Sequence, residues 1–119
     1  MSWLFESRGD VVWDVATQVA RLFVAEATAV AEWIEVPAGL DIRGDDTCQI
    51  DIEQFQKFTE SIASRYLSSS HPGLRMLIFG VVLPSLVILE RSGIQIAFDS
   101  SAGGQLIAQA REHARSMGR

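Results

Sequence analysis

The chain has 119 residues, a length that suits one compact domain and leaves too little for two hydrophobic cores. Hydrophobic residues make up 48% of the chain and charged residues 21%, which excludes a disordered chain because enough apolar surface is present to offset chain entropy. One cysteine excludes an intrachain disulfide framework, and with only two histidines it argues against a structural zinc site. We expect no metal and no cofactor.

The charge of the chain is unevenly distributed. The net charge is −5, but residues 1–60 hold twelve acidic and four basic residues, whereas residues 61–119 hold three acidic and six basic residues. An acidic chain without a basic run lacks the charge that releases counterions from phosphates, so we expect no binding to nucleic acid. The two halves either pair internally or leave an acidic face for a basic partner.

The N-terminal residues carry no basic region and no long apolar run, so they do not form a signal peptide. The most apolar stretch, Met76–Leu89, has 14 residues, fewer than the roughly 20 that span a bilayer. We therefore interpret it as a buried core helix and expect no membrane association. A free cysteine without an export signal indicates a cytoplasmic protein.

The first third of the chain predicts a β-hairpin followed by a helix. Residues 3–6 and 11–13 are apolar strands around a turn at Gly9. Asp14 is placed to cap a helix over residues 15–34, whose larger apolar side chains fall on one side. Pro37 and Gly39 end that helix, and residues 35–50 then form a polar connection.

The remaining chain predicts three more helices. Asp51 is the N-cap of the second, and Pro72 opens the third with His71 outside it. That third helix is apolar on every side, so its own domain or a second subunit must surround it, and Pro84 should kink it. Gly93 ends it, residues 94–98 alternate like a short strand, residues 100–104 form a turn, and residues 105–117 form the last helix. The expected fold is mainly α: a four-helix bundle-like single domain over residues 1–119, with a short N-terminal β-hairpin and a central all-apolar helix.

Glu26 breaks the apolar pattern of the first predicted helix. An ionised carboxylate buried among Leu22, Phe23 and Val30 would cost several kcal/mol unless it were paired. Tyr66 or Arg65 could pair with it, or the stripe could be partly exposed there. The functional alternative is a carboxylate that lines a pocket inside the bundle and acts as a general acid or base.

Two further residues were weighed for chemistry. His71 follows three serines and could act as a general base, but sequence neighbours do not make a catalytic geometry, and a cap before Pro72 is the preferred interpretation. Glu26, Tyr66 and His71 are thus the catalytic candidates. Cys48 lies in an acid-rich segment that disfavours its thiolate, which argues against a nucleophile.

Acidic residues gather between positions 41 and 53. Their spacing fails the EF-hand pattern, because Arg43 occupies a ligand position and the later glutamate is missing. Asp51 is explained as a cap. The other four form either a solvated loop or a surface that docks a partner, with a divalent-metal site as a third reading: Asp41, Asp45, Asp46 and Glu53.

Several short segments, in their order, carry a resemblance: Val12-Trp13-Asp14, Arg21-Leu22-Phe23-Val24, Pro37-Ala38-Gly39-Leu40, Asp51 with Phe55, Ser69-Ser70-His71-Pro72 and Leu89-Glu90-Arg91-Ser92-Gly93. Over about residues 3–92 the chain resembles an uncharacterised family of small actinobacterial proteins, a domain of unknown function. The resemblance implies a bacterial, cytoplasmic protein and implies no activity and no site residue.

The leading function predicted from the sequence is a small acidic cytoplasmic binding protein that docks a basic protein partner, as an immunity protein or a regulator does. The alternative is a small enzyme or ligand-binding protein whose pocket lies inside the bundle around Glu26, which would take a small-molecule ligand. A third reading is a structural subunit that forms a homodimer through the apolar helix.

Overall fold

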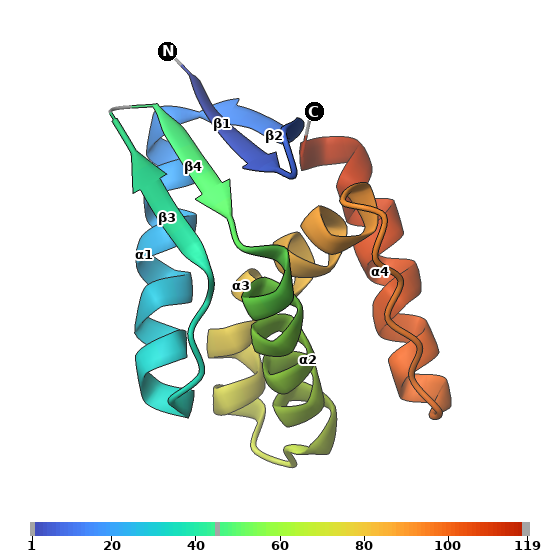
Figure 1. Cartoon of the computed structure of the whole chain (residues 1–119). Helices are drawn as coiled ribbons and strands as arrows, with labels where there is room; N and C mark the ends of the chain where they lie inside the picture. The colour runs from blue at the N-terminus through green and yellow to red at the C-terminus, as the bar shows by residue number, and fades with distance from the viewer. Residues whose placement is uncertain (1, 45, 118–119) are drawn as a thin grey trace.

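The computed structural model describes residues 2–44 and 46–117 (Figure 1). Its elements, in chain order, are β1 (Ser2–Ser7), β2 (Asp10–Ala16), α1 (Thr17–Ile34), β3 (Leu40–Arg43), β4 (Thr47–Ile50), α2 (Ile52–Ser68), α3 (Pro72–Arg91) and α4 (Ser101–Met117). The predicted helices, N-terminal hairpin and central apolar helix are confirmed. The fold class is α/β rather than mainly α, because β3 and β4 extend the hairpin into a mixed sheet.

The sheet has four strands in the order β2-β1-β4-β3. β1 pairs antiparallel with β2 and parallel with β4, and β3 pairs antiparallel with β4. The predicted polar connection over residues 35–50 is therefore wrong where β3 and β4 form. Each of its strands has only four residues, and polar side chains alternate with buried Cys48 and Ile50. An alternation of only four residues cannot be distinguished from a loop when the segment is mostly polar.

Two of the three predicted helix caps are confirmed. The Asp51 carboxylate accepts the Gln54 N–H at 3.2 Å, and His71 Nδ1 accepts the Leu74 N–H at 3.3 Å. Asp14, in contrast, does not cap α1. It belongs to β2, where it pairs with Leu4, and Ala16 precedes the helix without a side-chain cap.

The C-terminal third differs from the prediction in two places. Residues 94–98 form no strand; their backbone runs back along α4 (Figure 1), and Ile94, Ile96 and Phe98 are partly buried against the core. The predicted turn at residues 100–104 is instead the first turn of α4, in which Ser100 Oγ accepts the Gly103 N–H at 3.0 Å. The alternating apolar residues 94–98 are therefore buried by packing and not by pairing with a strand.

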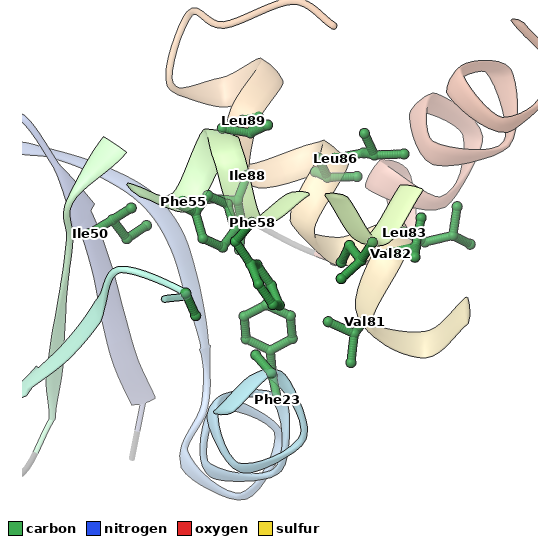
Figure 2. Close-up of a cluster of buried hydrophobic side chains, with 14 of the residues drawn as sticks. Phe23, Ile50, Phe55, Phe58, Val81, Val82, Leu83, Leu86, Ile88 and Leu89 are labelled. Atoms are coloured by element: carbon green, nitrogen blue, oxygen red, sulfur yellow. The ribbon is translucent and has the colours of Figure 1, made fainter. Parts of the chain in front are cut away.

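The core lies between the sheet and the helices, with α3 at its centre. Figure 2 shows side chains of α2 and α3 meeting Phe23 of α1 and Ile50 of β4. Phe55, Phe58 and Ile88 are fully buried in it. α3 is a continuous helix through Pro84, packed against α2 and α4.

α3 has 20 residues, six more than its apolar stretch indicates, and within the described chain it is the one helix long and apolar enough to cross a membrane. Half of its most apolar stretch is buried inside the fold.

Small residues decide which side of α1 faces the core. Ala20, Ala27 and Ala31 are buried together with Phe23, because alanines let the helix approach its neighbours closely. The larger Leu22 is 61% exposed. The helix is therefore rotated away from the orientation that its large apolar residues predict.

Candidate functional site

An open groove of about 840 Å³ lies between α1 and the sheet edge. The last two turns of α1, residues 36–39 and strand β3 form its walls, and the beginning of α2 closes one end. Four acidic residues line it, Glu32, Glu35, Asp41 and Asp51, against one basic residue, Arg43. The groove is therefore net acidic.

Gly39 fixes the shape of the groove where the chain turns from α1 into β3. Its φ is +74°, and a Cβ atom there would lie 2.8 Å from the Asp51 carbonyl oxygen and 2.9 Å from Gln54 Cβ. The Gly39 carbonyl accepts the Asp51 N–H at 2.8 Å. Only glycine lets this connection lie directly on the beginning of α2.

The carboxylates of the groove differ in how they are compensated. Asp41 forms an ion pair with Arg43, and Asp51 caps α2. Glu32 and Glu35 are exposed, and within the described chain neither carboxylate has a hydrogen bond or an ion pair.

Glu32 and Glu35 also occupy an unfavourable place. They lie at the C-terminal end of α1, where the helix dipole repels negative charge, and the last turn has no basic residue. Glu35 further adopts the left-handed conformation, with φ +59°. A glycine or a basic residue would suit this end of the helix better.

The four predicted docking residues fall in different places. Asp41 lines the groove from β3. Asp46 is exposed just before β4, where its carboxylate accepts a hydrogen bond from the Thr47 hydroxyl at 3.2 Å. Glu53 is exposed in the first turn of α2, and neither residue lines the groove. Asp45 lies outside the described residues. Sequence reasoning missed Glu32 and Glu35, because their proximity to Asp41 depends on β3, which was not predicted.

The predicted burial of Glu26 is wrong. Glu26 is exposed on α1, because the alanine face of that helix turns inward instead. Its two proposed partners are engaged elsewhere. The Tyr66 ring packs on Phe79 with centroids 5.4 Å apart, and the Arg65 guanidinium lies 5.1 Å from the centroid of the Trp33 ring. An interior pocket built on Glu26 is thus not supported.

His71 and Cys48 have structural surroundings. His71 is exposed, and its Nδ1 is occupied by the cap of α3. Cys48 lies in β4 rather than in a loop and is fully buried. Burial raises the pKa of its thiol to about 12, with a smaller contribution from the nearby Asp41 charge, so the thiolate is disfavoured.

A second surface carries exposed apolar side chains. Met76 is 79% exposed and Leu77 80% exposed on α3, on the same side as Gly80. The all-round apolar helix is therefore not fully surrounded by its own domain. This stripe is where the predicted homodimer would have to form.

Across residues 2–44 and 46–117, no three His, Cys, Asp or Glu side chains are grouped so that they could hold a metal ion. The molecule is an α/β protein that carries an acidic groove between α1 and β3. The chain belongs to a family of unknown function, DUF6086, which matches residues 1–119. No curated protein and no solved structure matches it.

Proposed function

We propose that this chain is a small acidic binding protein that docks a basic protein partner at the groove between α1 and β3. The observation that carries the proposal is the placement of Glu32 and Glu35 at the C-terminal end of a helix, where the helix dipole repels them, facing an open groove and without a compensating partner among residues 2–44 and 46–117. A bound cationic side chain would supply the missing charge. Cytoplasmic location and bacterial origin stay predictions, as does the role of an immunity protein or a regulator.

The charge of the whole N-terminal half supports the same role. With net −8 over residues 1–60, attraction acts over a longer range than a single ion pair. Such attraction speeds the encounter with a basic partner and weakens as salt screens it, over roughly 10 Å at 0.1 M ionic strength. Asp46 and Glu53 would contribute to this field without touching the partner in the groove.

The experiment compares two variants with the same change in net charge. Glu32→Gln with Glu35→Gln removes the groove charges, and Glu60→Gln with Glu112→Gln removes two exposed charges that do not line the groove. Association is measured at two ionic strengths with a basic partner purified from the source cell by affinity capture. The groove variant should associate more slowly, most clearly at low salt, and the control variant should stay near wild type.

Stability separates docking from a structural role. Removing charge that the helix dipole repels should raise the free energy of unfolding by about 0.3–1 kcal/mol for each glutamate at low ionic strength. Slower association together with higher stability would mark residues kept for binding. Equal association of the two variants would refute the groove as the docking site.

A further inference from the structure

The two edge strands of the sheet, β2 and β3, differ in their contacts with the rest of the fold. At the β2 edge, the Arg91 guanidinium donates to the Val12 carbonyl at 3.2 Å, and the Trp13 indole N–H donates to the Met117 carbonyl at 2.8 Å. The first contact joins the end of α3 to the backbone of β2, and the second joins the end of α4 to a side chain of β2. At the opposite edge, no further strand pairs with β3 within the described chain.

The pairing of β3 shows which of its backbone groups are free. The Asp51 N–H donates to the Gly39 carbonyl, so Gly39 and, two residues on, Asp41 direct their backbone groups toward β4. Leu40 and Ile42 alternate with them and direct their N–H and C=O groups outward. The open edge therefore offers two donors and two acceptors to an incoming chain.

Space for such a chain exists beside this edge. The flank of α1 next to β3 is exposed, with small side chains at Ala25 and Thr28 and with Arg21 and Glu32 on either side of them. Two hollows lie between this flank and β3, the groove of about 840 Å³ and a second of about 290 Å³ that Arg21, Ala25 and Ile42 line. A strand about 4.8 Å from β3 would run over the small residues.

We infer that the occupant of this edge is an extended basic segment of the partner protein, which binds β3 as a fifth strand. This inference rests on the proposed function and adds the mode of binding to it. The backbone of the segment would pair with Leu40 and Ile42, and the basic side chains on one face of the segment would meet Glu32 and Glu35 in the groove. Because β3 has only four residues, main-chain bonds and charge must act together.

The test uses a synthetic eight-residue peptide of alternating lysine and threonine with capped ends. A matched peptide carries N-methyl groups on alternate amides along one edge, and a third carries them along the other edge. Methylation keeps the charge and removes the pairing of one edge, so one of the methylated peptides should bind wild-type protein about tenfold more weakly, as the loss of two hydrogen bonds predicts. Ile42→Pro should weaken the unmodified peptide similarly, because the proline removes an outward N–H.

The outcomes separate the inference from the proposed function. If Glu32→Gln with Glu35→Gln weakens the peptide but both methylated peptides bind like the parent, charge docking holds and the fifth strand is wrong. If the methylated peptides lose affinity and the glutamate variant does not, pairing holds without the acidic groove. If the unmodified peptide does not bind at low salt, the inference is overturned.

Discussion

Gly39 offers the sharpest test of the connection that shapes the groove. It has positive φ, and a Cβ atom there would lie 2.8 Å from one backbone atom of the α2 start and 3.0 Å from another, neither of which can move without shifting the helix. Gly44, at the other end of β3, also has positive φ, but a Cβ there would meet nothing within 4 Å. The pair therefore separates backbone strain from steric overlap.

The magnitudes follow from these two terms. The left-handed conformation alone costs a non-glycine residue roughly 1 kcal/mol, so Gly44→Ala should destabilise the fold by about that amount. Overlap with backbone atoms adds to it, and Gly39→Ala should cost about 3 kcal/mol in total. For a chain of 119 residues the entropy of unfolding is about 0.25 kcal/mol/K, so the melting temperature should fall by about 4 °C for Gly44→Ala and about 12 °C for Gly39→Ala.

Thermal unfolding followed by circular dichroism measures both variants against wild type. A larger loss for Gly39→Ala than for Gly44→Ala is the predicted result. Equal losses would mean that residues 36–39 do not lie against α2 as described, and the groove would lose one of its walls.

Three further predictions concern other parts of the molecule. Burial raises the pKa of the Cys48 thiol above its ordinary value, so the folded state favours the protonated thiol. The free energy of unfolding should therefore be unaffected below about pH 9 and fall by about 1.4 kcal/mol per pH unit between about pH 9 and pH 12. A Cys48→Ala control should lack this slope. Ser85 Oγ is buried and has no hydrogen-bond partner in the described part of the chain, so Ser85→Ala should raise the denaturation midpoint by an amount equivalent to about 1 kcal/mol. A lower midpoint would show that the hydroxyl does form a stabilising hydrogen bond. If the chain forms a homodimer through α3, Met76→Gln with Leu77→Gln should shift sedimentation toward the monomer, and a wild-type monomer at high concentration would refute that dimer.

Much of the helical part of the fold could be predicted because its signals are local. Asp51 and His71 cap helices in whatever tertiary context they occupy, and a stripe at helical spacing defines α2. The sheet was only half predicted, since β4 pairs with β1 across more than forty residues. No local pattern encodes that parallel pairing.

The candidate site was predicted in part for the same reason. Asp41 stood out as an acidic residue in a connection, and it does line the groove. In the sequence, Glu32 and Glu35 have no feature beyond that of polar residues at a helix end, because only the position of β3 brings them close to Asp41. The prediction for Glu26 failed because Leu22 and Trp33 were expected to face the core together with Phe23, whereas in α1 Phe23 is buried with the alanines and Leu22 and Trp33 are exposed.

Amide hydrogen exchange tests most directly whether the groove and the β3 edge together bind a basic extended segment. In the free protein the outward N–H groups of Leu40 and Ile42 should exchange rapidly, whereas the Asp41 N–H, which points toward β4, should be protected. Addition of the lysine-threonine peptide at low salt should protect Leu40 and Ile42 and leave Asp41 unchanged. If Leu40 and Ile42 exchange as fast with saturating peptide as without it, the segment does not pair with this edge.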